Sequence, residues 1–127
     1  MKIYGIGTDI VSVDRVKKKF GDKNFLKRLF NAEEVIKCKK LVNSQNCYAK
    51  RFAAKEAFSK ALGTGISKGM KFNEIIVLNE KNGKPYIKLT GETKKIVKKK
   101  FKNKKPKISL SLSDEKKYAV AFVTISL

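Results

Sequence analysis

The sequence has no histidine, and its 127 residues include only two cysteines. Without histidine, a zinc site of mixed cysteine and histidine ligands cannot form. Cys38 and Cys47 are nine residues apart and lack the CxxC spacing typical of metal and redox motifs. We therefore expect both cysteines to be free thiols, as is usual in cytoplasmic proteins.

Long apolar runs are also missing. No segment reaches the roughly 18 uninterrupted apolar residues that predict a membrane-spanning helix. The N-terminus lacks the basic and then apolar pattern of a secretory signal. These absences predict a cytoplasmic protein that does not bind or cross a membrane. The length suits one hydrophobic core and is too short for two, so we expect a single domain over residues 1–127.

Acidic residues are scarce: 11 Asp and Glu stand against 31 Lys and Arg, and the formal net charge is +20. Such a field attracts acidic partners and speeds their encounter without identifying them. A lysine-rich composition can equally reflect the codon usage of a genome. Only three of the basic residues are arginines, Arg15, Arg28 and Arg51. Because a guanidinium can bind phosphate or carboxylate with two hydrogen bonds, these three are stronger candidates for specific contacts than the lysines.

The order of the expected elements indicates an α+β fold, in which an antiparallel sheet packs against a long central helix. Residues 2–13 are rich in Ile and Val and predict the first strand. Residues 45–62 are rich in Ala, Lys and Glu and precede Gly63, which predicts a long helix with a glycine C-cap. The other expected elements are two short helices around Gly21, a helix capped by Asn31, a hairpin of strands 72–79 and 84–90 turning at Asn82 and Gly83, a basic helix at 90–105, and strands at 107–114 and 118–127, the last of them central.

Asp9 places a charge inside an apolar strand. An unpaired buried polar group costs roughly 2–7 kcal/mol, so this carboxylate needs a partner. Alternate residues of a strand share a face, so Gly5, Gly7 and Asp9 point the same way, and the glycines remove side-chain bulk beside the carboxylate. Asp9 is therefore either a turn or cap residue or a functional carboxylate beside a place of close approach.

Glu56 is an isolated acid in the lysine-rich long helix. At 100° per residue it shares a face with Ala49, Phe52, Ala53 and Lys60. One interpretation is a surface ion pair between Glu56 and Lys60, worth about 0.3–0.5 kcal/mol. The other is that this small-residue face meets the glycines of the first strand, so that Glu56 and Asp9 converge. Two carboxylates completed by water and phosphate oxygens suit Mg²⁺.

Four segments resemble, in register, the holo-[acyl-carrier-protein] synthases, which are short bacterial phosphopantetheinyl transferases: GIGTDIVSVDRV, RFAAKEAFSKALGTGI, NGKPYI and SLSDEKKYAVAFV. The resemblance implies the 4′-phosphopantetheinyl transferase fold and a homotrimer with active sites between subunits. It also implies a reaction that supports fatty acid biosynthesis. The 4′-phosphopantetheine arm of coenzyme A moves to a serine of apo acyl carrier protein and leaves adenosine 3′,5′-bisphosphate, with Mg²⁺ as the cofactor.

The resemblance also implies roles for individual residues. Asp9 of GTDI and Glu56 of AAKEA would be the metal ligands, in agreement with the pair found from the residues alone. Glu56 would take the serine proton, directly or through a metal-bound water. Lys60 would contact the coenzyme A phosphates and stabilise the leaving group, and Arg51 would bind a nucleotide phosphate.

Other implied positions have plainer alternatives. Gly63 of the GTG turn would let the backbone approach the nucleotide, although a C-cap explains it equally well. Ser111 and Ser113 would line the coenzyme A site, although alternating serines are also typical of a solvated strand face. Asp114 stands where some relatives have histidine, so a mechanism that needs an imidazole at this position is excluded.

The family binds its carrier protein through basic residues of the first helix. Here Arg15 and Arg28 match the two arginine positions, and Lys18, with its lysine neighbours, would add to the positive field. The main rival is a nucleic-acid-binding protein, which the net charge favours. It would need aromatic residues interleaved with arginines on a sheet, or a recognition motif, and neither occurs. We therefore expect no nucleic-acid partner.

Overall fold

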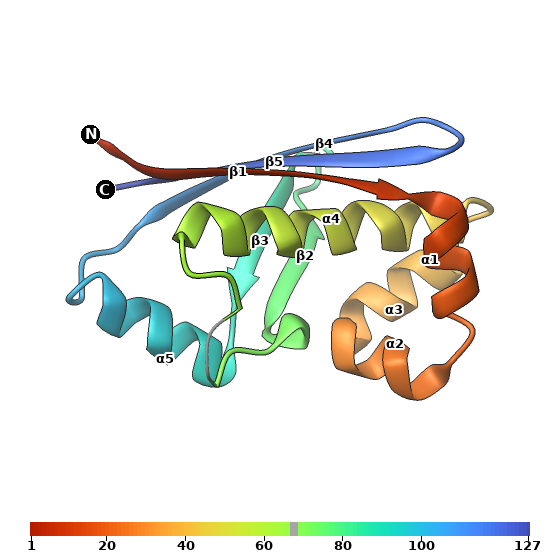
Figure 1. Ribbon diagram of the computed structural model, residues 1–127, viewed down its shortest axis with the longest axis horizontal. Helices are drawn as coiled ribbons and strands as arrows, with labels where there is room; N and C mark the ends of the chain where they lie inside the picture. Colours follow the sequence, from red (N-terminus) through yellow and green to blue (C-terminus); the bar gives the residue numbers. More distant parts are fainter. Residues whose placement is uncertain (67–68) are drawn as a thin grey trace.

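The computed structural model of the protein describes residues 1–66 and 69–127, and a three-stranded antiparallel sheet lies along one long helix (Figure 1). The sheet has the order β1 (Ile3–Ser12), β5 (Tyr118–Ser126) and β4 (Lys107–Asp114). The apolar last strand is central, as predicted from its composition. Backbone hydrogen bonds between Lys2 and Leu127 hold the two chain ends together beside the sheet.

The long helix α4 (Ser44–Leu62) ends at Gly63, whose φ of 84° gives the predicted left-handed C-cap. The helix approaches β1 very closely. A Cβ added to Gly7 would overlap the carbonyl oxygen of Ala57 and lie 2.8 Å from the Ala61 nitrogen, and one added to Gly5 would overlap the Ala61 carbonyl. The glycines of the first strand therefore allow the contact with the alanine face of the helix, as the sequence indicated.

Three short helices cover one end of α4 (Figure 1): α1 (Val13–Lys19), α2 (Lys23–Leu29) and α3 (Ala32–Lys39). Ser12, Asp22 and Asn31 are their N-caps, and Asn31 forms a capping box with Glu34. Phe20 contacts Phe30 and Tyr48 with ring centroids 5.4 and 5.8 Å apart, which joins this end to α4.

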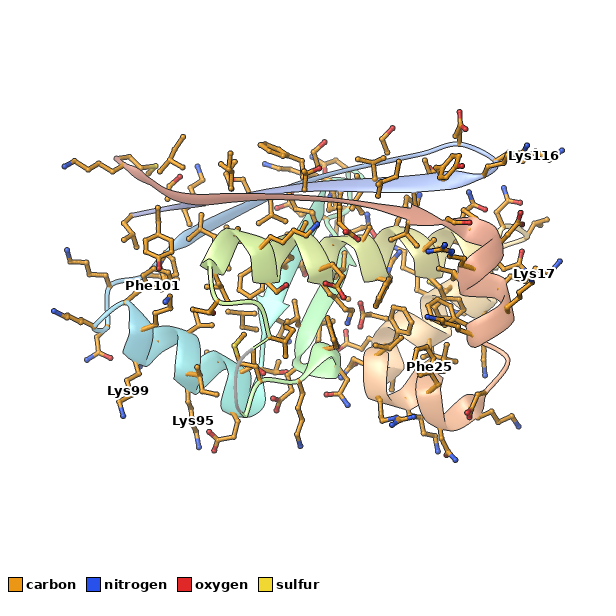
Figure 2. All side chains as sticks on the ribbon, in the orientation of Figure 1. Lys17, Phe25, Lys95, Lys99, Phe101 and Lys116 are labelled. Carbon is orange, nitrogen blue, oxygen red and sulfur yellow. A yellow bond between two sulfur atoms is a disulfide. The ribbon has the colours of Figure 1, made fainter. Side chains whose placement is uncertain are left out.

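On the side of α4 opposite the sheet lie the hairpin of β2 (Ile75–Asn79) and β3 (Pro85–Leu89) and the helix α5 (Gly91–Lys100) (Figure 1). The hairpin was predicted, but its first strand begins three residues late, because Phe72–Glu74 form a 3-10 turn, η1. In α5, Lys95 and Lys99 point away from the molecule, whereas Phe101, just beyond its end, packs toward the sheet (Figure 2).

Lys55 and Glu34 form a fully buried ion pair that joins α4 to α3, with Nζ and Oε1 2.8 Å apart. Lys55 also donates to the carbonyls of Phe72 and Ile75, and Glu34 accepts a hydrogen bond from the Val77 amide. Burial lowers the pKa of Lys55 to about 8, against the opposing effect of Glu34. Every charged atom of the pair thus has partners, and the pair fixes where the hairpin meets the helices.

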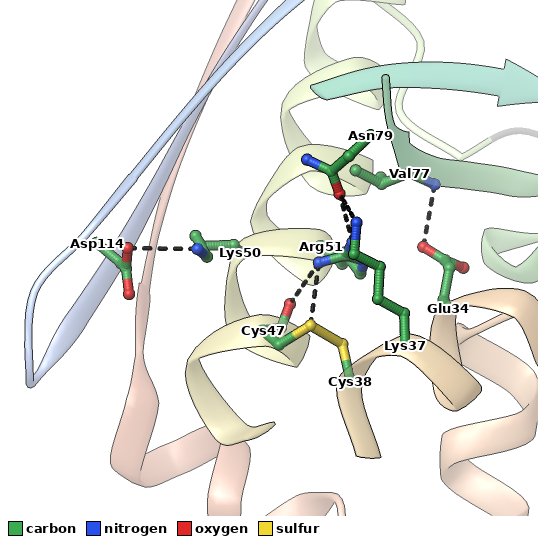
Figure 3. The surroundings of a disulfide bond; sticks show 9 residues. All are labelled: Glu34, Lys37, Cys38, Cys47, Lys50, Arg51, Val77, Asn79 and Asp114. Atoms are coloured by element: carbon green, nitrogen blue, oxygen red, sulfur yellow. Dashed lines mark hydrogen bonds and ion pairs between the residues drawn. A yellow bond between two sulfur atoms is a disulfide. The ribbon is translucent and has the colours of Figure 1, made fainter. Parts of the chain in front are cut away.

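The expectation of two free thiols is wrong, because Cys38 and Cys47 form a disulfide (Figure 3). Cys38 lies in the last turn of α3 and Cys47 in the first turn of α4. The short connection between the two helices folds back and places their Cα atoms 5.5 Å apart. A rule based on CxxC spacing does not detect cysteines that a helix–turn–helix brings together. Among the described residues, no helix combines the length and apolarity needed to cross a membrane.

Candidate active site

Asp9 and Glu56 line the same cavity, which has a volume of about 280 Å³ and lies between β1, α1 and α4. Asp9 follows Gly7 on the strand face that packs against α4, and Glu56 lies one helical turn from the buried Ala53. The close glycine and alanine contact therefore brings the two carboxylates together, as predicted from the residues. The other charged and aromatic side chains of the cavity are Arg15, Lys19, Phe20, Phe25 and Phe52.

The partner that Asp9 requires is Lys60. The Lys60 ammonium lies 3.1 Å from the Asp9 carboxylate and donates to the Thr8 carbonyl at 2.9 Å. The Asp9 side chain is 18% exposed and that of Lys60 54% exposed, so the pair sits where the protein meets solvent. Lys60 thus pairs with the strand carboxylate, and the alternative of a simple surface pair between Glu56 and Lys60 does not describe this site.

Burial and the neighbouring charge of Asp9 raise the pKa of Glu56, while Lys60 acts in the opposite direction. A carboxylate whose ionisation is disfavoured by a neighbouring negative charge lies in a site that a cation stabilises. In residues 1–66 and 69–127, no third acidic, cysteine or histidine side chain completes a metal cluster with them. Two protein carboxylates with the remaining positions left to water or substrate match the coordination habits of Mg²⁺.

The predicted docking residues lie on the helices beside this cavity. Arg15 lines it from α1, and Lys18 is exposed on the same helix. Arg28 lies on α2 with its guanidinium 5.9 Å from the centre of the Phe25 ring, which is itself a wall of the cavity. The structure therefore places Arg15 at the cavity of the two carboxylates, and Lys18 and Arg28 on the helices that border it.

Arg51 is not part of that cavity. It is 4% exposed and lines a second cavity of about 600 Å³, also bordered by Lys37, Lys50 and Asn79. Its guanidinium donates to the sulfur and carbonyl of Cys47, at 3.1 and 3.4 Å, and to the Asn79 side chain at 3.0 Å (Figure 3). Its Nε, although buried, has no hydrogen-bond partner among the described residues. Burial lowers the pKa of Arg51, and the charge of Glu34 opposes that shift.

The remaining predicted residues lie apart from both cavities. Gly63 is the C-cap of α4, and open space surrounds the position where its Cβ would be. Ser111 and Ser113 are exposed on β4, paired with Phe122 and Val120 of β5. Within one chain, the structure therefore does not bring these three residues to Asp9 and Glu56.

Several lining residues were missed from the sequence. Phe20 and Phe25 form an aromatic side of the first cavity together with Phe52, which the sequence had placed on the face of Glu56, but the three come from different helices and the turn after α1. Lys37 donates a hydrogen bond to the side-chain oxygen of Asn79 beside Arg51. The several phenylalanines between residues 20 and 30 were a sequence signal for the aromatic side of the first cavity. No local pattern indicated that Lys37 and Asn79 lie beside Arg51.

A family model described as the 4′-phosphopantetheinyl transferase superfamily matches residues 5–123. A holo-[acyl-carrier-protein] synthase of Pelagibacter ubique is 51% identical over 125 residues, which cover 98% of each chain. The chain belongs to the holo-[acyl-carrier-protein] synthase family of phosphopantetheinyl transferases. The family consists of transferases, and the two carboxylates therefore lie in an enzyme.

Solved structures of the family agree with this fold. The holo-[acyl-carrier-protein] synthase of Neisseria meningitidis has a TM-score of 0.88 and 40% identity, over 99% of this chain and 100% of that one. The Helicobacter pylori holo-[acyl-carrier-protein] synthase, solved in complex with coenzyme A, has a TM-score of 0.79 and 34% identity, over 95% of this chain and 99% of that one. The predicted α+β fold and family are thus confirmed.

Proposed function

We propose that this protein transfers the 4′-phosphopantetheine group of coenzyme A to a serine of apo acyl carrier protein, releases adenosine 3′,5′-bisphosphate and supports fatty acid biosynthesis in the cytoplasm. The names of the relatives and the coenzyme A bound to the Helicobacter pylori enzyme support the two substrates. The observation that carries the proposal is the convergence of Asp9 and Glu56 in a cavity bordered by Arg15. We assign this activity to one domain over residues 1–127.

Asp9 and Glu56 would hold Mg²⁺. The site fits, because two carboxylates repel each other there and the Lys60 ammonium already offsets the charge of Asp9. When bound, the metal supplies polarisation of the pyrophosphate and neutralises charge on the leaving phosphate. Lys60, held at the cavity by Asp9 and the Thr8 carbonyl, would contact the same phosphates and stabilise the leaving group.

Glu56 would accept the proton of the attacking serine, directly or through a water molecule. In the absence of the metal, burial and the charge of Asp9 raise the pKa of this carboxylate. Phe20, Phe25 and Phe52 line the same cavity and would limit water beside it. The chain thus supplies an acceptor and an apolar wall at the same cavity.

Arg15, Arg28 and Lys18 would dock the carrier protein. All three are exposed on α1 and α2 next to the cavity, so an acidic helix bound there would present its serine to Glu56. Charges at the edge of an interface mainly raise the association rate and make it sensitive to salt. The absence of a recognition motif argues against nucleic acid as the partner.

A homotrimer would complete the site. Arg51, with its buried unpartnered Nε, suits a nucleotide phosphate but lies in a different cavity from Asp9 and Glu56. The outer face of the sheet also exposes apolar side chains to solvent, namely Ile6, Ile10, Tyr118 and Phe122. Burying this face between copies would allow Arg51, Gly63, Ser111 and Ser113 of one subunit to line the coenzyme A site of another.

The test is transfer of labelled phosphopantetheine to apo acyl carrier protein, with Mg²⁺ present or removed by a chelator. Asp9→Asn and Glu56→Gln should each lower kcat at least about a hundredfold, the lower range for loss of general acid–base catalysis. Glu92→Gln, at an exposed site on α5, is the control and should leave turnover unchanged. Wild-type turnover in either active-site variant would contradict the two-carboxylate site.

A further inference from the structure

The disulfide lies in direct contact with the arginine of the second cavity. The Arg51 guanidinium is 3.1 Å from the sulfur of Cys47 and 3.4 Å from its carbonyl (Figure 3). Cys38 is completely buried, whereas Cys47 is 3% exposed and lines the cavity. A reagent that enters the cavity therefore meets the Cys47 side of the bond and Arg51 together.

The surroundings of Cys47 are strongly positive. Lys37 and Lys50 border the same cavity as Arg51. Burial and the charges of Arg51 and Lys50 lower the pKa of Lys37. The acids of the lining are the exposed Glu80 and Asp114, and Asp114 pairs with Lys50. Lys81 also borders the cavity, so its basic side chains outnumber these two acids, and the buried Glu34 pairs with Lys55. Such a positive environment favours the thiolate form of a cysteine.

We propose that the Cys38–Cys47 bond is a redox site that sets how well Arg51 binds the nucleotide phosphates of coenzyme A. The inference rests on the proposed function, in which Arg51 contacts those phosphates. In the disulfide, the Cys47 sulfur is neutral and accepts only a weak hydrogen bond, so the charge of Arg51 is available to a ligand. After reduction, a Cys47 thiolate pairs with Arg51 and competes with phosphate for the guanidinium.

The reduction needs a dithiol. One thiolate of the dithiol attacks a cysteine sulfur, the bond between the two cysteines breaks, and a mixed disulfide forms. The second thiol of the reductant then closes its own disulfide and releases the protein. Two electrons and two protons pass to the pair. Cys38 remains a thiol, and Cys47 gives its proton to solvent and becomes the thiolate beside Arg51. A disulfide oxidant reverses the exchange by the same route.

Two single variants separate the charge effect from a loosening of the helices. Cys38→Ser removes the disulfide and keeps the Cys47 thiolate, whereas Cys47→Ser removes both. We expect reduction of the wild type to raise KM for coenzyme A about five- to tenfold, with kcat changed by less than about twofold. Cys38→Ser should show the raised KM with or without reductant. Cys47→Ser should keep the low KM in both conditions.

The redox proposal is overturned if KM is the same in the oxidised and reduced protein, or if the two variants behave alike. Mass spectrometry under native conditions establishes the redox state, since reduction adds two hydrogens. Calorimetry with adenosine 3′,5′-bisphosphate as the probe gives the affinity without turnover. Transfer that occurs equally in both states would refute the redox site alone. Absence of both transfer and probe binding in both states would refute the proposed function and, with it, this inference.

Discussion

Gly7 of β1 lies against the backbone of Ala57 in α4 so closely that a methyl group at Gly7 would overlap the Ala57 carbonyl oxygen. This contact sets the separation of strand and helix, and with it the positions of Asp9 and Glu56. The alanine and glycine residues of the two elements thus determine the geometry of the candidate metal site.

Gly7→Ala should lower the free energy of unfolding by about 3 kcal/mol, the upper end for overpacked interiors, because backbone atoms of a buried helix must move. Urea denaturation monitored by circular dichroism measures the loss. Gly21→Ala is the matched control, because no atom lies within 4 Å of the added Cβ. Equal stability of the two variants would show that the strand and helix can separate without cost.

The buried pair of Glu34 and Lys55 gives a second prediction. Lys55→Met leaves the Glu34 carboxylate buried without its cation and should cost about 3–5 kcal/mol in unfolding free energy. The double variant Glu34→Gln with Lys55→Met should recover part of this loss. Glu92 and Lys95 are an exposed pair, 3.8 Å apart, and Lys95→Met should change stability by less than about 0.5 kcal/mol. A double variant no more stable than Lys55→Met would argue against the charge explanation.

Glu74 predicts a dependence on pH. Its side chain caps α5 by accepting hydrogen bonds from the amides of Glu92 and Thr93 and from the Thr93 hydroxyl. Burial by itself would raise the pKa of Glu74, but these hydrogen bonds outweigh it and hold the pKa below the ordinary value of 4.5. The carboxylate therefore stabilises the fold above that ordinary value, and the contribution is lost as pH falls through the lowered pKa.

Glu74→Gln should accordingly reduce stability at pH 7 by about 0.5–1 kcal/mol, the lower range for a helix cap. The difference from wild type should shrink as the pH falls below 4.5. Thermal unfolding across pH 3–8 measures both effects, with Glu80→Gln at an exposed position as the control. A difference that stays constant down to pH 3 would mean that the charge of Glu74 is not the stabilising feature.

Arg15 tests the docking surface. Arg15→Ala should raise KM for apo carrier protein about five- to tenfold and leave KM for coenzyme A within about twofold, since its charge guides the acidic partner. The defect should diminish at high salt, because salt screens the same attraction in the wild type. Lys95→Ala, on the distant α5, is the control in the same steady-state assay. Equal damage to both KM values would contradict the proposed division of roles.

The fold follows largely from local signals in the sequence. Gly63 ends the long helix, and Asn82 with Gly83 closes the hairpin, because each turn depends on a backbone conformation that few residues adopt. The alternation around Gly5, Gly7 and Asp9 identified the strand face that meets α4. The convergence of Asp9 and Glu56 could therefore be predicted before any coordinates were known.

Features that depend on contacts between separate helices and strands could not be predicted from local signals. The cysteines meet because α3 turns back onto α4, and Arg51 is separated from Glu56 because five helical residues place it on another face. The late start of β2 has a similar origin, since Glu74 turns toward the first amides of α5. In each case the deciding partner comes from a different element.

The pairing of the two chain ends affects how the molecule responds to mechanical force. Lys2 bonds to Leu127, and the antiparallel ladder of β1 and β5 runs inward from that point. Tension between the ends would load the hydrogen bonds of this ladder one after another, starting at the rim, instead of all together in shear. The protein should therefore open at lower force when pulled from its ends than when pulled so that β1 and β5 are sheared along their length.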